Sequence, residues 1–219
     1  MLRAGMWAYG RGEMLDASMA ALMFTAFAGS AAPLAQGTSP PVPPYAVTAI
    51  AGILTAAGWM GWKQIGSKEM GFAWTLRTAP WTLAALALAL PGAALWAWTA
   101  GGDRGGAPDG LRIWLALIGF QLLWVALPEE LLFRGALQGM LRRGDSAQDP
   151  FPIPLSVICS GILFALVHVM AEQSVGGLRV FAPGILFGVL RERTGSLLAP
   201  ILVHAVSNAA LAVFLGRAG

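Results

Sequence analysis

Long apolar stretches separated by short polar ones dominate the chain. A membrane-spanning helix needs about 20 apolar residues, and the pattern predicts an all-α, polytopic transmembrane helical bundle with about seven spans, within a range of about six to eight. The sixth stretch is the shortest, which fits a tilted or half-buried helix sheltered by protein. The seven stretches are residues 15–36, 45–62, 79–100, 113–141, 155–171, 180–190 and 197–215.

The polar stretches between these runs predict loops. Residues 38–44 are rich in proline, residues 101–110 are rich in glycine, and residues 142–154 combine charge with prolines, so none of them favours a continuous helix. Residues 191–196 read as a polar connection in which Ser196 can cap the next helix. Residues 63–78 predict an amphipathic segment at the membrane interface.

Composition agrees with lipid as the solvent. Apolar residues make up 57% of the chain and charged residues 11%, whereas soluble domains have roughly 45–50% and about 25%. The net charge is +3, but the basic residues are scattered, so composition predicts the lipid bilayer and no nucleic acid as a partner. The single cysteine, Cys159, excludes an internal disulfide and a cysteine-based zinc site.

Charge placement predicts an orientation, because Lys and Arg favour the cytoplasmic loops. With seven spans and a cytoplasmic N-terminus, nine basic residues lie inside and four outside, while Arg134 lies within a span. The inner set is Arg3, Arg11, Lys63, Lys68, Arg77, Arg142, Arg143, Arg191 and Arg193, and the outer set is Arg104, Arg112, Arg179 and Arg217.

The ends of the runs carry two further signals. The first run follows Arg3 and Arg11 and contains small residues, as a signal peptide does, but its apolar stretch continues past them, which favours a retained helix. Several tryptophans, Trp96 and Trp98 among them, lie near predicted span ends, as expected for an aromatic belt.

Ionisable residues inside the spans are the first candidates for chemistry, since such groups must face protein or a water-filled cavity. Glu130 and Arg134 are one helical turn apart and can pair. Glu129 is turned about 100° away from Glu130 and has Phe133 one turn later, so it is the freer carboxylate and a candidate general base. The alternative is a pair of carboxylates that only binds Arg134 or lines a transport path.

The two histidines of the chain, His168 and His204, also lie in apolar runs, and Asn208 follows His204 by one turn. From the helical rise, these side chains and Glu129 can meet at one depth, which predicts a polar intramembrane cavity. There a carboxylate can deprotonate water, an imidazole can pass on its proton, and His204 and Asn208 can stabilise an oxyanion. Zinc held by Glu129, His168 and His204 is an open alternative, although no H-E-x-x-H motif is present.

Three motifs in order resemble the CPBP intramembrane proteases, which include the CAAX prenyl endopeptidases and the Abi-type proteins. The resemblance covers about residues 123–208 and implies a helical bundle whose cavity opens toward the cytoplasm. It divides the single membrane domain into N-terminal transmembrane helices (1–111) and a catalytic core (112–219). The motifs are Glu-Glu-x-x-x-Arg at 129–134, Phe-x-x-x-His at 164–168 and His-x-x-x-Asn at 204–208.

The resemblance implies roles for these residues. Glu129 would activate a water with help from His168, and His204 and Asn208 would form the oxyanion site. Glu130 completes the catalytic set, with Arg134 and Phe164 in support. A glutamate-type mechanism needs no cofactor, with zinc as the alternative.

The function expected from the resemblance is that of an intramembrane endopeptidase. It would cleave near the C-terminus of a membrane-embedded or lipidated peptide or protein substrate. A proton-coupled transporter and a non-catalytic immunity or scaffold protein are the alternatives. The short chain, with twelve Arg against two Lys, favours a bacterial inner membrane protein with a cytoplasmic N-terminus.

Overall fold

The computed structural model describes residues 50, 52–58, 61, 70–101, 110–142 and 152–215. Within these segments the secondary structure is helical and contains no strand, which confirms the predicted all-α class there. The predicted run 15–36, the possible signal peptide and half of the run 45–62 lie outside the described residues. Residues 52–58 are helical, and Ala56 packs into the core.

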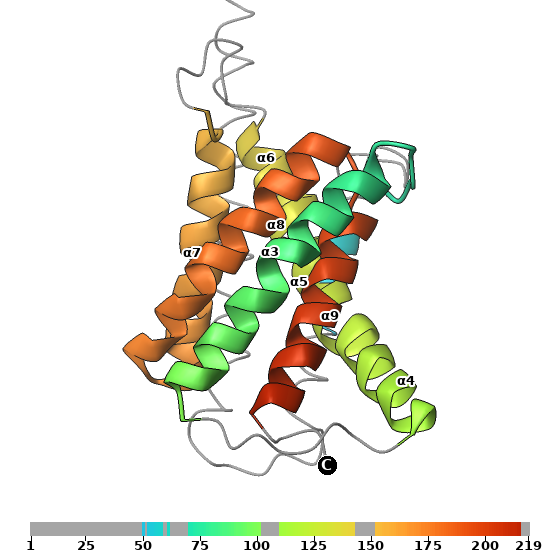
Figure 1. Cartoon of the computed structure of the whole chain (residues 1–219). Helices are drawn as coiled ribbons and strands as arrows, with labels where there is room; N and C mark the ends of the chain where they lie inside the picture. The colour runs from blue at the N-terminus through green and yellow to red at the C-terminus, as the bar shows by residue number, and fades with distance from the viewer. Residues whose placement is uncertain are drawn as a thin grey trace, which may run out of the picture.

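The later apolar runs form the helices shown in Figure 1. They are α3 (Thr78–Thr99), α7 (Leu155–Glu172), α8 (Phe181–Thr194) and α9 (Leu198–Phe214). The 3-10 helix η3 (Val175–Val180) leads into α8. The fourth run is one continuous helical segment, Leu111–Arg142, which together with α3 and α7 is long and apolar enough to cross a membrane. Beyond these three helices, the total of about seven spans stays a prediction.

Helix α8 is longer than the sequence suggested. It continues through Thr194 and ends at Gly195, whose φ of 67° is left-handed, so the supposed connection 191–196 is largely helical. The reason is that protein partners hold its polar side chains: Glu192 pairs with Arg142 at 3.1 Å and accepts a hydrogen bond from Gln138 at 2.9 Å. Ser196 Oγ accepts a hydrogen bond from the Leu198 N–H at 3.2 Å, as expected of a cap.

The segment predicted to lie at the interface, residues 63–78, is described from Met70 onward. Residues 70–77 are irregular, and α3 begins at Thr78. Met70 is buried in the main apolar core together with Leu197, and the Gly71 carbonyl accepts a hydrogen bond from the Leu197 N–H at 2.8 Å. Met70 and Gly71 therefore pack into the protein, whereas Phe72, Trp74 and Leu76 are exposed, and the interfacial position of the segment stays a prediction.

Glycines let α7 and α8 approach closely. A Cβ atom placed on Gly188 would lie 2.8 Å from Val157 of α7, and one on Gly161 of α7 would lie 2.7 Å from Ile185 of α8. Gly184 similarly faces Phe164. Gly184 and Gly188 form a G-x-x-x-G pair, which permits such close helix packing, and the packing brings the α8 backbone near polar side chains of the 111–142 segment.

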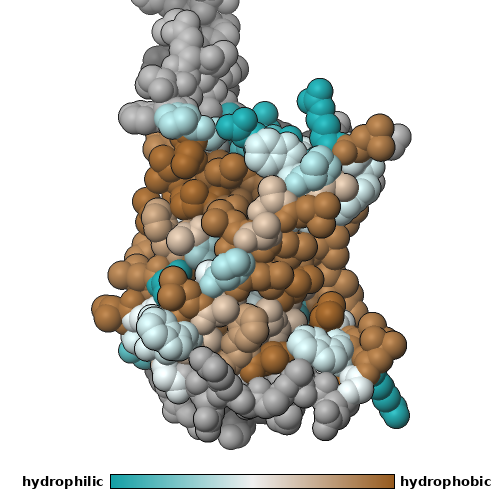
Figure 2. All heavy atoms as spheres, in the orientation of Figure 1, coloured by the Kyte–Doolittle hydropathy of each residue, from teal (hydrophilic) through white to brown (hydrophobic). Residues whose placement is uncertain are grey.

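The outer surface of the helices is apolar. On α3, Leu83, Leu88, Leu95 and Trp98 are between 60% and 70% exposed. Figure 2 shows apolar side chains across the middle of the visible face and polar side chains toward its ends. Exposed apolar surface on this scale is characteristic of contact with lipid, in keeping with the composition.

Candidate active site

Glu129 and Glu130 lie on a short α-helical turn between two π-helical segments. Helix α5 (Leu127–Glu130) is flanked by π-helical segments η1 (Gln121–Ala126) and η2 (Leu131–Leu137), with α4 (Leu111–Phe120) before them and α6 (Gln138–Arg142) after. The sequence suggested one regular helix. Pro128 was the available signal, since it lacks a backbone donor, and π turns recur at functional sites.

Glu130 is fully buried in a hydrogen-bonded network. Its Oε1 accepts from Arg134 Nη1 at 3.1 Å, which confirms the predicted pair, and from His204 Nδ1 at 2.9 Å, which links it to α9. Arg134 is also buried, donates to the Gly184 carbonyl of α8 at 2.8 Å and lies 4.6 Å from the centre of the Phe164 ring. Because a buried charge is costly unless it is paired, this network fixes three helical segments relative to one another.

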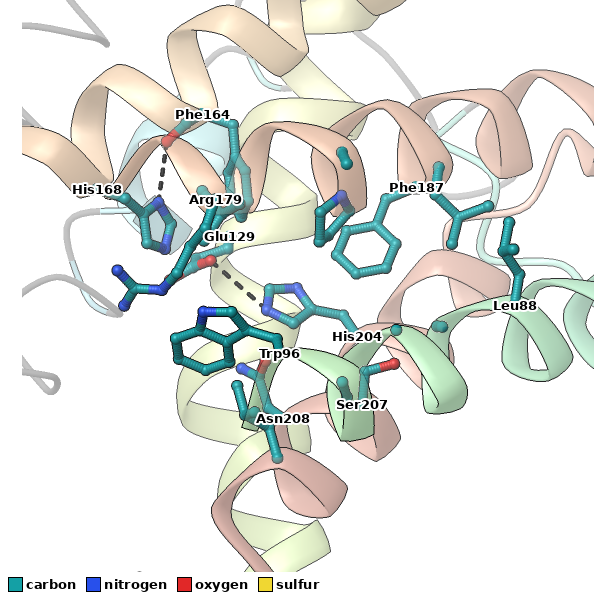
Figure 3. Close-up of a pocket in the computed structure, with 18 of the residues that line it drawn as sticks. Leu88, Trp96, Glu129, Phe164, His168, Arg179, Phe187, His204, Ser207 and Asn208 are labelled. Atoms are coloured by element: carbon teal, nitrogen blue, oxygen red, sulfur yellow. Dashed lines mark hydrogen bonds and ion pairs between the residues drawn. The ribbon is translucent and has the colours of Figure 1, made fainter. Parts of the chain in front are cut away.

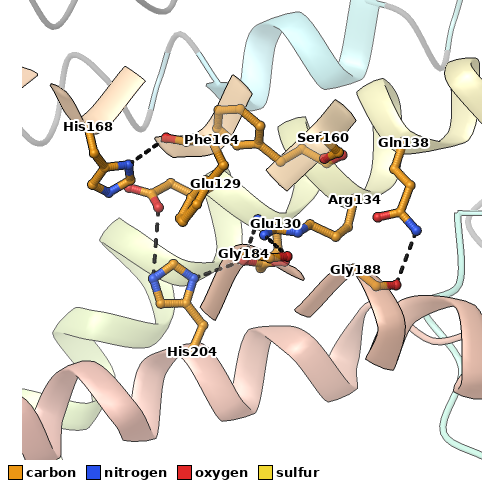
Figure 4. Close-up of polar contacts among 11 residues, drawn as sticks. Glu129, Glu130, Arg134, Gln138, Ser160, Phe164, His168, Gly184, Gly188 and His204 are labelled. Atoms are coloured by element: carbon orange, nitrogen blue, oxygen red, sulfur yellow. Dashed lines mark hydrogen bonds and ion pairs between the residues drawn. The ribbon is translucent and has the colours of Figure 1, made fainter. Parts of the chain in front are cut away.

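Glu129 has fewer partners than Glu130, as its helical position predicted. Its side chain is 17% exposed, and its Oε2 lies 3.8 Å from His204 Nε2, which is too far for a hydrogen bond. Within the described residues, Oε2 has no hydrogen-bond partner. Figure 4 shows the carboxyl between the two imidazoles. Glu129 is thus a carboxylate held beside His204 without a hydrogen bond to it.

His168 is fixed by its own helix. Its Nδ1 lies 2.9 Å from the Phe164 carbonyl oxygen, which can only accept, so Nδ1 carries the hydrogen. The neutral ring then has its lone pair on Nε2. The Phe164 ring packs 4.5 Å from the His168 ring and also contacts Arg134, so Phe164 separates the buried network from the pocket.

Asn208 is held by a residue that the sequence reasoning missed. Its Nδ2 donates to Gln121 Oε1 at 3.2 Å, which joins α9 to the start of η1. An amide within the apolar run that holds both glutamates was the signal that pointed to Gln121. One turn earlier, the His204 ring stacks on Phe187 with centroids 4.9 Å apart.

A cavity of about 510 Å³ brings these groups together. Glu129, Phe164, His168, His204 and Asn208 all line it, while Glu130 and Arg134 lie behind its wall. Figure 3 shows the polar groups gathered on one side and α3 forming another. Most other lining residues are apolar, so the cavity is less polar than expected, and its depth in a membrane stays a prediction. Its remaining polar side chains are Arg179 and Ser207.

The position of the cavity bears on two predictions about orientation, one from the basic residues and one from the family resemblance. Trp96 lies near the end of α3, His168 near the end of α7 and Arg179 before α8, so they share one end of the bundle (Figure 1). Arg142 and Arg191 lie at the opposite end. The distribution of basic residues predicts that the Arg142 end lies in the cytoplasm. The resemblance implies that the cavity opens to the cytoplasm, which would place the end with Trp96, His168 and Arg179 there. The two predictions therefore favour opposite orientations.

The alternative zinc ligands do not form a metal site in this arrangement. Among the described residues, no group of three or more His, Cys, Asp or Glu side chains could hold a metal ion. The Nδ1 contacts of His204 with Glu130 and of His168 with the Phe164 carbonyl leave the Nε2 atom of each ring for another partner, as in metal-ligating histidines. Zinc therefore stays the alternative that activity measured with a chelator would test.

Comparison with known proteins gave one match. Residues 111–210 match the family model described as type II CAAX prenyl endopeptidase Rce1-like. No curated protein and no solved structure matched. The matched segment runs from the start of α4 into α9, so it contains every predicted site residue but leaves out α3, which forms part of the cavity wall.

Proposed function

We propose that this membrane protein, whose residues 111–210 match the Rce1-like family model, is an intramembrane endopeptidase of the glutamate type. Its substrate is a membrane-anchored or lipidated peptide that is cut near its C-terminus. The observation that carries the proposal is the Glu129 carboxyl, without a hydrogen-bond partner for Oε2, beside His204 in a cavity also lined by His168 and Asn208.

Glu129 acts as the general base. It takes a proton from water as the water oxygen attacks the carbonyl carbon of the scissile bond. The proton then passes to the leaving nitrogen as the carbon–nitrogen bond breaks. The His168 Nε2 lone pair accepts a hydrogen bond from the same water and orients it, because Nδ1 is already committed to the Phe164 carbonyl.

The negative charge on the substrate oxygen is stabilised from α9. In its imidazolium form His204 donates from both nitrogens, Nδ1–H to Glu130 and Nε2–H into the cavity. Asn208 adds an N–H that is not used by Gln121. Donors fixed in place before the charge develops are the most effective kind, and the Glu130–Arg134 pair supplies that fixation.

The apolar wall suits the lipid-linked part of the substrate. Leu88, Ala89, Gly92 and Ala93 of α3 line the cavity opposite the polar groups. An isoprenoid or acyl chain packed along this wall would place the adjacent peptide beside Glu129. The large exposed apolar surface of α3 allows such a chain to arrive from the bilayer.

The direct test is hydrolysis of a prenylated peptide by the full chain in proteoliposomes. Wild-type protein is expected to cleave it and Glu129→Gln is not, while Glu192→Gln, the same atom change at the far end of α8, retains activity. Activity should be unchanged by a metal chelator. Turnover by Glu129→Gln at the wild-type rate discards the mechanism, and pH-driven ion flux without cleavage supports a transporter instead.

A further inference from the structure

We propose that Arg179 binds an anionic oxygen group of the ligand in this cavity, the terminal carboxylate of the substrate peptide, and so selects peptides that end close to the scissile bond. The proposal rests on the proposed function, because it names the part of the substrate that the same cavity recognises. Arg179 lies outside the three motifs, and the sequence placed it among ordinary loop charges.

Arg179 is the only arginine or lysine among the described residues that line the cavity. It lies on η3, and its guanidinium carbon is 4.8 Å from the centre of the Trp96 ring of α3. Trp96 is half-buried and lines the cavity as well, so it is turned inward and is not a simple belt residue. The pair places a cation against an aromatic face at the cavity edge, where cation–π attraction holds it.

Glu172 fixes the plane of the guanidinium. Arg179 Nη1 donates to Glu172 Oε2 at 2.6 Å and Nη2 donates to Oε1 at 2.8 Å, a two-pronged pair with fixed geometry. A guanidinium has five N–H groups, so three remain for another acceptor. The Arg179 side chain is 36% exposed and lines the cavity.

The rest of the cavity explains why one cation matters. Apart from the groups assigned to water activation and the oxyanion, its wall is apolar, and a full negative charge placed there would lack other partners. A peptide that continues past the cavity carries no such charge, whereas a peptide that ends there carries a carboxylate. Arg179 therefore stabilises the terminated peptide selectively. Because Glu172 already offsets part of its charge, the effect should be moderate.

Binding of two matched probes tests the proposal. The probes are a prenylated peptide with a free C-terminal carboxylate and the same peptide with a C-terminal amide. Affinity is measured for the full chain carrying Glu129→Gln, which cannot hydrolyse them, in nanodiscs of neutral lipid. We expect the carboxylate to bind roughly tenfold more tightly, as one charge-assisted contact of about 1.4 kcal/mol allows. Adding Arg179→Gln should remove that difference, and Arg179→Lys should retain part of it.

Kinetics separate recognition from a merely structural role. With Glu129 intact, Arg179→Gln should raise KM for the carboxylate probe roughly tenfold and leave kcat, the amide KM and the melting temperature nearly unchanged. A fall in both kcat values together with the melting temperature would show that the Glu172–Arg179 pair only ties η3 to α7, and would overturn the proposal. A preference that persists in Arg179→Gln, or that is absent in the parent, would also overturn it.

A lipid phosphate offers similar oxygen acceptors. A second set of binding measurements, with phosphatidylglycerol added to the nanodiscs, shows whether Arg179 binds lipid headgroups instead. If Arg179 binds headgroups, phosphatidylglycerol will weaken binding of both probes equally, through Arg179 alone, with no preference between them, and the carboxylate assignment fails. If wild-type protein cleaves neither probe, the proposed function fails, while the binding preference still reports on Arg179 independently.

Discussion

The two faces of α5 present neighbouring glutamates to opposite environments. Glu130 faces a dry interior in which Arg134 and His204 both donate to one of its oxygens. The Oε2 atoms of both glutamates have no hydrogen-bond partner among the described residues, but of the two only Glu129 lines the cavity. Both carboxylates sit on the same short helical segment, so their difference arises from what packs against each face.

The two glutamates have the same chemistry, but their surroundings suit them to different roles. The Glu130 face gains rigidity from partners on α8 and α9, and rigidity is what an oxyanion site requires. The Glu129 face keeps a carboxylate oxygen that no hydrogen-bond donor occupies, which suits a group proposed to accept a proton. Substitutions should therefore separate into those that remove chemistry and those that loosen the frame.

The largest effect on activity without a matching effect on stability is expected for Glu129→Gln. Hydrolysis should fall by about 10²–10⁴-fold, the usual contribution of a general base, while the melting temperature stays close to that of wild type because no hydrogen bond of Oε2 is lost. Cleavage assays and thermal unfolding in detergent measure the two effects. Equal loss of activity and stability would erase the distinction between the faces.

A large loss of stability is expected for Arg134→Met. Removing one partner leaves Glu130 buried with a single donor, which should cost about 3–5 kcal/mol of stability. Unfolding in denaturant measures this. The double variant Glu130→Gln with Arg134→Met should be more stable than Arg134→Met alone, since no unpaired charge remains. If Arg134→Met is as stable as wild type, the Glu130–Arg134–His204 network does not hold the helices together.

Asn208→Ala should reduce kcat by about 10²-fold, because one oxyanion donor is lost. KM should change little, since this donor acts mainly when charge develops on the substrate oxygen. Steady-state kinetics on the prenylated peptide give both values. A rise in KM with unchanged kcat would reassign Asn208 to substrate binding.

The smallest effect is expected at Gln121, which positions Asn208. Gln121→Leu removes the acceptor and should lower kcat roughly tenfold, equal to about 1.4 kcal/mol, in the range of one hydrogen bond. Gln121→Glu keeps an oxygen at the same place and should restore most of the rate. Similar rates for both variants would mean that the contact with Asn208 has no functional weight.

Local sequence rules predicted most of the described fold. Hydrophobic runs located α3, α7 and α9 closely, and helical spacing predicted the Glu130–Arg134 pair. The end of α8 was wrong because its polar last turn is stabilised by Glu192 contacts with distant residues. Hydropathy cannot register such contacts.

For the site, the sequence supplied the candidates but not their arrangement. It could not show that His204 bonds Glu130 and lies near Glu129, because that depends on how α9 rotates against α5. The roles of Trp96 and Arg179 could not be predicted for the same reason, since each depends on a partner from another element. The catalytic roles themselves stay predictions until activity is measured.

The exclusion of α3 from the matched region has a consequence for selectivity. The groups proposed to break the bond all come from residues 111–210, whereas one wall of the chamber they face is supplied by residues 78–99. Swapping side chains on that wall would alter which hydrocarbon tail fits while leaving the reactive atoms untouched. Under the proposed function, the residues that contact the hydrocarbon tail and the residues that hydrolyse the peptide bond would therefore lie on different segments of the chain.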